Sequence, residues 1–318
     1  MLETIANSIR NNKNVIEKKD INPFVQFIHK NSYKNERIYS DIGEDSAAIK
    51  DNNKYILLTT DRIKTEFVEN HPYGAGFSSL LVGVDDIYCC GGTPLAASII
   101  ISYKEINIGH KIIEGICEAS QKFQIPVIRG HTKPKSNYYE LSSTIIGEIE
   151  KKNYISALNA QFNDDIILSV DFDGKIGKAS EYYWDTVTFK STAQVLHKRK
   201  SMHQIAKQHL ANSSKDISNG GIFGTLLQLI RYSKVGANVN INNIEIPPIL
   251  RDQNYSLEKY LKMYLTTSYI LTASEQNSEK ILETFLQYGL FSKIIGKIIK
   301  GDQLKINNGK DSLTVMRY

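Results

Sequence analysis

The sequence predicts an α+β fold made of two domains. At 318 residues the chain is longer than a single core of ordinary size needs. Helical and strand-like stretches follow one another without strict strand–helix–strand alternation. A charged break from Glu148 to Asn153 separates two halves of similar outline. We therefore expect one domain over residues 1–152 and a second over residues 153–318.

Composition limits the classes of function. Hydrophobic residues make up 41% of the chain and charged residues 23%, the balance of a soluble globular protein. The net charge of +5 comes from 39 basic residues scattered among 34 acidic ones, which disfavours nucleic acid as a partner. No apolar run reaches membrane-spanning length, and the amino terminus lacks a signal-peptide layout. We expect a cytoplasmic protein that binds neither membrane nor nucleic acid.

Three cysteines, Cys89, Cys90 and Cys117, give an odd count without paired spacing, which also favours a reducing compartment. Their apolar surroundings favour packing over metal or redox chemistry.

In the first half, residues 1–30 contain two segments of helical spacing, the second beginning at Asn22-Pro23. The elements expected after them are a strand at 55–60, a helix at 76–92, a strand at 95–102, a helix at 109–123 and strands at 125–128 and 141–147. In the second half we expect strands at 164–170, 237–241 and 268–273, helices at 191–211 and 278–288, and a last strand at 291–299 interrupted at Gly296.

Four acidic residues share one context. Each lies at the end of an apolar element, close to Gly, Ser or Thr: Asp45, Asp61, Asp86 and Asp216. Such hard oxygen ligands suit Mg²⁺, which is normally shared with nucleotide phosphates. Without a metal the cluster would repel itself and at least one pKa would rise. The sequence therefore predicts a magnesium-nucleotide site built from distant segments, although an isolated residue such as Asp61 also fits a turn.

Two polar turns are candidates for binding phosphate. The stretch from Lys215 through Ser218, Asn219, Gly220 and Gly221 precedes an apolar helix, so free backbone N–H groups would converge there. A plain helix N-cap explains Ser218 or Asn219 equally well. The second turn is Gly130-His131-Thr132, where His131 alone also fits a packed loop histidine.

Neither GxxxxGK[ST] nor GxGxxG occurs, which argues against a P-loop or a Rossmann enzyme. The adjacent acids Asp85 and Asp86 interrupt an apolar helix, so we expect a cation or a hydrogen-bond donor beside one of them.

The order of these motifs resembles the AIR synthase superfamily, which includes thiamine-monophosphate kinase and selenophosphate synthetase. The motifs that carry the resemblance are Gly43-Glu44-Asp45, Thr59-Thr60-Asp61, Gly83-Val84-Asp85-Asp86, Gly130-His131-Thr132 and Lys215-Asp216-Ile217-Ser218-Asn219-Gly220-Gly221. The resemblance implies a PurM-like fold, in which the sheet of an N-terminal α/β domain pairs with a second copy into a dimeric barrel. A C-terminal α+β domain would complete a cleft for ATP.

The resemblance also implies roles for residues. Asp45, Asp61, Asp86 and Asp216 would bind Mg²⁺. The nucleotide would contact Gly130, His131, Thr132, Lys215, Ser218, Asn219, Gly220 and Gly221. The implied activity is an ATP- and Mg²⁺-dependent phosphotransferase or ligase-type reaction on a small metabolite. The alternative is a nucleotide-binding scaffold or regulatory subunit without turnover.

The chain departs from the pattern of its better-understood relatives. Gly83 replaces a polar residue and Asn219 replaces an acid, which argues against thiamine monophosphate as substrate. Residues 1–40 contain neither Cys nor Gly, which argues against selenophosphate synthesis. Glu44 and Asp85 stay open as further metal ligands. The aromatic run at 181–185 is expected either in a substrate pocket or in the core.

Overall fold

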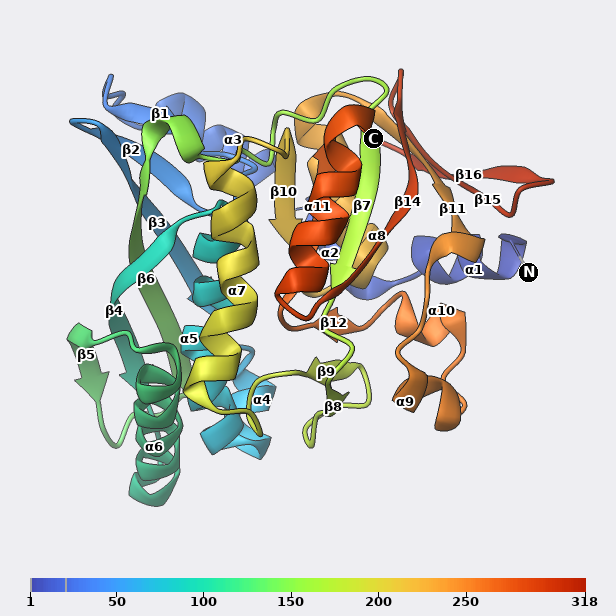
Figure 1. Cartoon of the computed structure of the whole chain (residues 1–318). Helices are drawn as coiled ribbons and strands as arrows, with labels where there is room; N and C mark the ends of the chain where they lie inside the picture. The colour runs from blue at the N-terminus through green and yellow to red at the C-terminus, as the bar shows by residue number, and fades with distance from the viewer. Residues whose placement is uncertain (1, 21) are drawn as a thin grey trace.

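A computed structural model describes residues 2–20 and 22–318. Two mixed β-sheets stand side by side, and helices α5 and α7 lie between them (Figure 1). The mixed helix and sheet content of both halves confirms the expected α+β class. No helix in the described part of the chain is both long and apolar enough to cross a bilayer.

The first sheet has six strands in the order β1-β2-β3-β6-β4-β5. Its strands are β1 (Ile38–Ser40), β2 (Ala47–Asp51), β3 (Lys54–Arg62), β4 (Thr93–Ser102), β5 (Val127–Lys133) and β6 (Glu140–Glu150). Neighbours run antiparallel except β4 and β5, which are parallel because helix α6 (Ile106–Phe123) connects them. Helix α5 (Pro72–Cys89) packs on one face of this sheet and against α6.

The second sheet has seven strands in the order β10-β13-β7-β14-β11-β15-β16. They are β7 (Asp165–Val170), β10 (Ser213–Asp216), β11 (Gly236–Asn240), β13 (Ser268–Ala273), β14 (Phe291–Ile299), β15 (Gln303–Asn307) and β16 (Ser312–Arg317). A small third sheet contains β8 (Lys175–Ile176), β9 (Tyr183–Asp185) and β12 (Tyr264–Leu265). The helices of this half are α7 (Thr192–Lys207), α8 (Gly221–Ser233), α9 (Pro248–Asp252), α10 (Leu257–Tyr260) and α11 (Glu275–Gln287).

The expected last strand is not the last. Strands β15 and β16 follow it, because short alternating segments after Gly301 extend the sheet. The interruption expected at Gly296 is present as a register shift between Ile294 and Gly296. At Gly296 an added Cβ would lie 2.2 Å from the Asn238 carbonyl oxygen, so β11 approaches too closely for any other residue.

The first two amino-terminal helices, α1 (Leu2–Arg10) and α2 (Lys13–Asp20), pack on the second half. Helix α3 (Asn22–Asn31) instead lies near β1 of the first half, where His29 contacts Asp41 at 3.0 Å. A further short helix, α4 (Thr65–Asn70), precedes α5. Ile5 and Ile9 of α1 are buried in the core of the second sheet. The Arg10 guanidinium donates to the carbonyls of Val315 and Thr314 at 2.6 and 2.7 Å. The domain boundary at residue 152 stays a prediction, and the first helix packs across it.

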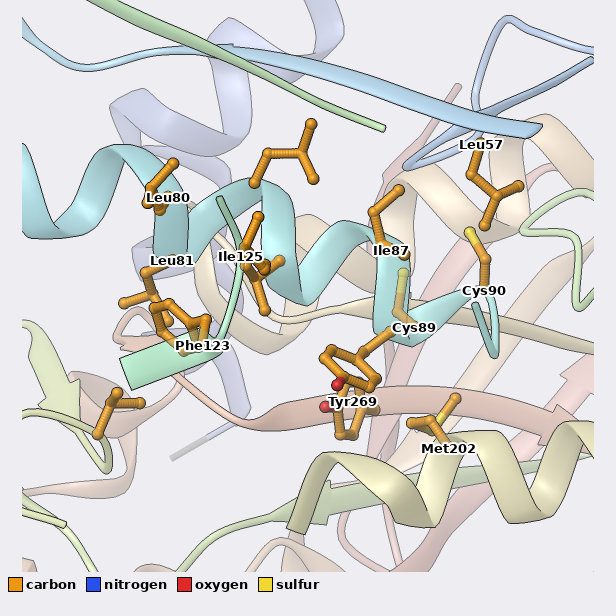
Figure 2. Close-up of a cluster of buried hydrophobic side chains, with 14 of the residues drawn as sticks. Leu57, Leu80, Leu81, Ile87, Cys89, Cys90, Phe123, Ile125, Met202 and Tyr269 are labelled. Atoms are coloured by element: carbon orange, nitrogen blue, oxygen red, sulfur yellow. The ribbon is translucent and has the colours of Figure 1, made fainter. Parts of the chain in front are cut away.

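A continuous apolar core joins the two halves. Leu57, Ile87 and Cys90 of the first half belong to the same cluster as Met202 of α7 and Tyr269 of β13 (Figure 2). Because this shared core is apolar and extensive, the two halves hold each other in a fixed orientation. Side chains that face the gap between the sheets are therefore positioned from both sides.

Candidate active site

A cavity of about 1710 Å³ opens between the two sheets. Its walls come from α1, α2, β3, α5 and the end of β10. The four acidic residues predicted from the sequence all line this cavity: Asp45, Asp61, Asp86 and Asp216.

Each acid is placed by a different local feature. Asp61 is the second-last residue of β3, Asp86 lies in the last turn of α5, and Asp216 ends β10. Asp45 follows a turn at Gly43, whose φ is 92°. A Cβ at Gly43 would lie 2.5 Å from the Tyr232 ring, so only glycine allows this turn to pack against α8.

Asp45 connects the two halves through three donors. It accepts hydrogen bonds from the Lys215 ammonium, from the Cys89 thiol at 2.9 Å and from the Asp216 backbone N–H at 3.3 Å. Burial raises the pKa of Cys89, so the thiol keeps its proton and serves as a donor. Sequence patterns gave no sign of this thiol, because the apolar setting of Cys89 indicates packing alone.

Asp61 and Asp86 form the other part of the cluster. The Thr59 hydroxyl donates to Asp86. Burial raises the pKa of Asp61, and hydrogen bonding to Asp86 opposes that rise. The Oδ2 atom of Asp61 is buried and has no partner among the described residues. A buried carboxylate oxygen without a donor is unfavourable unless it is protonated or binds a cation.

The whole cluster is short of positive charge. Burial, reinforced by Asp61, Asp216 and Asp45, raises the pKa of Asp86 well above its ordinary value. Burial and Asp45 do the same to the pKa of Asp216. Ligand atoms of Asp45, Cys89 and Asp216 lie within 4.8 Å of one another. Oxygen-rich, self-repelling carboxylates with an unpartnered oxygen fit a hard divalent cation such as Mg²⁺.

Glu44 and Asp85 have other partners. Glu44 accepts from the Ser156 hydroxyl at 2.6 Å and from the Ala157 N–H at 2.7 Å, so both its oxygens hold the segment between the halves. Asp85 forms a buried ion pair at 2.8 Å with Arg199 of α7. This pair confirms the predicted cation beside the adjacent acids, and it connects α5 to the second half.

Two lysines reach the cluster. Burial alone would lower the pKa of Lys215, but the Asp45 carboxylate raises it above the ordinary value. Lys18 of α2 was not predicted from the sequence. Its Nζ lies 3.1 Å from the Ser218 hydroxyl and 3.1 Å from the Gln228 side-chain oxygen. Burial, reinforced by Lys215, lowers the pKa of Lys18 to about 8.

Only part of the turn before α8 lies where the predicted contact with nucleotide requires it. Ser218 and Asn219 line the cavity with Lys215, whereas Gly220 and Gly221 are not among the lining residues. The Gly221 N–H donates to the Ser218 carbonyl at 3.0 Å, and the Ile222 N–H donates to the Leu261 carbonyl at 3.2 Å. These N–H groups therefore already have acceptors, and a nucleotide role for Gly220 and Gly221 stays a prediction.

The predicted phosphate-binding turn at Gly130, His131 and Thr132 lies away from the cavity. They belong to β5, an exposed edge strand separated from β3 by β4 and β6. None of the three lines the cavity. Within one copy of the chain the structure does not bring them to the carboxylates, so their contact with nucleotide also stays a prediction.

The aromatic run at 181–185 divides between the cavity wall and the core, and a role in a substrate pocket stays a prediction. Tyr182 and Tyr183 line the cavity, and Tyr183 stacks on Tyr264 with ring centroids 5.7 Å apart. Trp184 is fully buried, and its indole N–H donates to the Asp171 carbonyl at 2.8 Å. Tyr183 and Trp184 are successive residues of β9 and face opposite sides of the strand, whereas Tyr182 precedes the strand.

Fold and cavity together define a two-domain α+β protein with an acidic site between its halves. Comparison with known families identifies the family to which this two-domain protein belongs. The model of the AIR synthase related protein, N-terminal domain, matches residues 43–149, and that of the C-terminal domain matches residues 175–307. The chain belongs to the AIR synthase-related family, as the resemblance predicted.

Sequence similarity to known proteins covers most or all of the chain. An uncharacterised protein of Methanocaldococcus jannaschii is 34% identical over 100% of this chain and 97% of its own length. A thiamine-monophosphate kinase of Buchnera aphidicola is 26% identical, covering 80% of this chain and 83% of its own.

Solved structures share the fold at low identity. A ThiL structure complexed with AMPPCP and TMP has a TM-score of 0.69 at 19% identity, covering 93% of this chain and 97% of that one. PurL of Thermotoga maritima complexed with ATP has a TM-score of 0.72 at 14% identity over 87% of this chain. The chain spans about half of that PurL, 47% of its length. These likenesses confirm the PurM-like fold.

Proposed function

We propose that this protein is an ATP- and Mg²⁺-dependent enzyme that activates a small metabolite by phosphoryl transfer, as a kinase or as a ligase with a phosphorylated intermediate. One observation carries the proposal: four carboxylates from four separate segments of the chain line one large cavity. Relatives named as a kinase and as a phosphoribosylformylglycinamidine cyclo-ligase support it. So do neighbours solved with ATP and AMPPCP.

Asp45, Asp61, Asp86 and Asp216 are the residues proposed to bind Mg²⁺. Their oxygen ligands, their raised pKa values and the unpartnered oxygen of Asp61 support this assignment. Bound Mg²⁺ neutralises charge on nucleotide phosphates. Lys215 holds Asp45 in place through its ion pair. Ser218 and Asn219, which line the same cavity, offer polar contacts to the nucleotide.

The acceptor is proposed to bind near the tyrosines. Tyr182, Tyr183 and Tyr264 offer aromatic edges and hydroxyl groups on the second-half side of the cavity. Asn219 lines the cavity at the position where the thiamine kinase resemblance calls for an acid, so thiamine monophosphate is not the acceptor we propose. Gly83 faces Ile145 and Thr59 of the first sheet, so its lack of a side chain affects packing there.

We also propose that the protein forms a homodimer through the first sheet. On the face away from α5, Leu58 pairs with Ile146 and Ile100 with Ser142 across neighbouring strands. Leu58, Ile100 and Ile128 are exposed, and no element of the described chain covers this face (Figure 1). An uncovered apolar sheet face of this kind is typical of an interface. A cytosolic location remains part of the proposal.

Calorimetry with Mg²⁺ and ATP tests the proposal. We expect the wild-type protein to bind Mg·ATP, and Asp216→Asn to lose most of the affinity at unchanged fold by circular dichroism. Turnover is then measured as ADP formation across a panel of small metabolites. Binding without turnover across a broad panel would favour the nucleotide-binding scaffold. Absence of binding by the wild type would contradict both functions.

A further inference from the structure

Lys18 reaches the carboxylate cluster from a helix that carries no sequence motif. Its ammonium lies between the Ser218 hydroxyl and the Gln228 oxygen, each 3.1 Å away. Its aliphatic stem passes 3.6 Å from where a Cβ of Gly220 would lie and 3.7 Å from that of Gly224. These are ordinary contact distances for a Cβ, so small residues at these two positions let α2 pack closely on α8. Val15, one turn earlier, is buried against the same surface.

The surroundings of Lys18 differ from those of Lys215. Lys215 is neutralised by its ion pair with Asp45. Both hydrogen-bond acceptors of Lys18 are uncharged, and none of the ion pairs within the described residues includes it. An ammonium has three N–H donors, so with two in use a third is free to bind a ligand. The positive charge of Lys18 thus stays available to an anion in the cavity.

Other candidate donors are less well placed. The Gly221 and Ile222 N–H groups at the start of α8 already donate to backbone carbonyls. Among the other cations that line the cavity, Lys262 pairs with Glu258, whereas Lys13, Arg62 and Lys64 are exposed. Lys18 is the cation that combines access to the cavity, a fixed stem and a charge held in no direct ion pair with the described residues.

We propose that Lys18 binds a non-bridging phosphate oxygen of the nucleotide, using the N–H that has no protein acceptor. This inference rests on the proposed function, and it makes the amino-terminal helix α2 part of the nucleotide site. Lys18 then complements the metal ligands: the carboxylates hold the cation, and the ammonium contacts the anionic phosphate directly. The Ser218 and Gln228 acceptors keep the side chain extended before the nucleotide arrives.

Lys18→Met tests the inference, because it removes the charge and keeps the length of the stem. A charge-assisted hydrogen bond to phosphate predicts a loss of about tenfold to a hundredfold in affinity for Mg·ATP. Affinity for adenosine, measured by competition, should not change. Lys18→Arg should retain most of the ATP affinity. Lys111→Met removes an exposed charge of α6 outside the cavity and should have little effect.

Two results would overturn the inference while leaving the proposed function intact. One is wild-type ATP affinity in Lys18→Met. The other is an equal loss for ATP and adenosine, which would indicate a structural role for Lys18; a lowered melting temperature would accompany it. If the wild type itself fails to bind Mg·ATP, the proposed function and this inference fall together.

Discussion

At the scale of single residues, the acidic cluster is arranged for a ligand and at the expense of the free protein's stability. Asp86 shows this most clearly. Burial and three neighbouring carboxylates raise its pKa, while its hydrogen-bond donor, Thr59, lowers it only in part. Native proteins retain such unfavourable groups where function requires them, so replacing one should stabilise the metal-free chain.

Asp86→Asn should therefore raise the melting temperature of the metal-free protein at pH 7. The neutral amide removes repulsion with Asp61, Asp216 and Asp45 and still accepts from Thr59. A relief of about 1 kcal/mol corresponds to an increase of about 2 °C. Calorimetric melting in EDTA measures it, and the same variant should show weakened Mg²⁺ binding. A lower melting temperature in EDTA would show that the cluster is not self-repelling.

The pH dependence of stability follows from the same shifts. Asp86 and Asp216 have pKa values raised above their unfolded values in the folded chain. Above about pH 4 the folded state thus binds more protons than the unfolded state. Their contribution to the free energy of unfolding is present at low pH and is lost as pH rises through the raised pKa values. In EDTA, the free energy of unfolding of Asp86→Asn should exceed that of the wild type by an amount that increases between pH 5 and 7. A difference that decreases over this range would contradict the predicted direction of the pKa shift.

The sequence predicted this site only where local pattern carries the information. Asp61, Asp86 and Asp216 lie in the last turn or last residues of a helix or strand, and Asp45 lies in the turn before β2, so local pattern reveals all four. Lys18 could not be found in this way, because its partners lie 200 and 210 residues further along the chain. The thiol of Cys89 likewise gains its polar partner only when Asp45 folds over it.

At the scale of elements, the contact between α2 and α8 decides where Lys18 lies. A Cβ at Gly224 would lie 3.5 Å from Val15 and 3.7 Å from Lys18, which is ordinary van der Waals contact. A single methyl group fits this contact, whereas a branched side chain does not. A small residue at this position therefore permits the packing distance and, through it, the position of the lysine.

Gly224→Ala should be neutral or should stabilise the protein by up to about 1 kcal/mol, because alanine is the better helix former. Gly224→Leu should displace α2, at a cost of about 1–3 kcal/mol from overpacking. Chemical denaturation measures both, and Mg·ATP affinity should decrease only in the leucine variant. Equal ATP affinity in the two variants would show that nucleotide binding does not depend on the position of α2.

Most elements were predictable because helical and strand periodicity is local. The strand over Phe291–Ile299 and the helix up to Phe123 are present as expected. Strands β15 and β16 were missed because they are short and their apolar residues are few. The packing of α1 on β16 was also missed, since it depends on a contact between the two ends of the chain.

At the scale of the whole molecule, the first sheet is covered by helices of the described chain on one face only. Helices α5 and α6 cover one face (Figure 1). On the other face Leu58 and Ile100 are exposed. The single chain forms an open six-stranded sheet, so any barrel requires a second copy. His131 lies at the β5 edge of this same sheet, far along the strand order from Asp61. Sequence order could not show this separation.

Ile100→Lys should convert the proposed dimer to a monomer. A lysine at this position would bury a charge in the sheet-to-sheet contact without a partner. Light scattering after size exclusion measures the mass, and Leu286→Lys on exposed α11 is the matched control that should leave it unchanged. A wild-type protein that is monomeric at micromolar concentration would contradict the dimer.

The central claim is that the four carboxylates and Lys18 form one metal–nucleotide site between the two halves. A crystal structure with Mn²⁺ and AMPPCP tests it most directly, because the manganese position is visible by anomalous scattering. We predict an anomalous peak among Asp45, Asp61, Asp86 and Asp216, with a phosphate oxygen at hydrogen-bond distance from the Lys18 ammonium. Nucleotide bound away from these carboxylates, or a cavity without nucleotide at saturating AMPPCP, would contradict the claim.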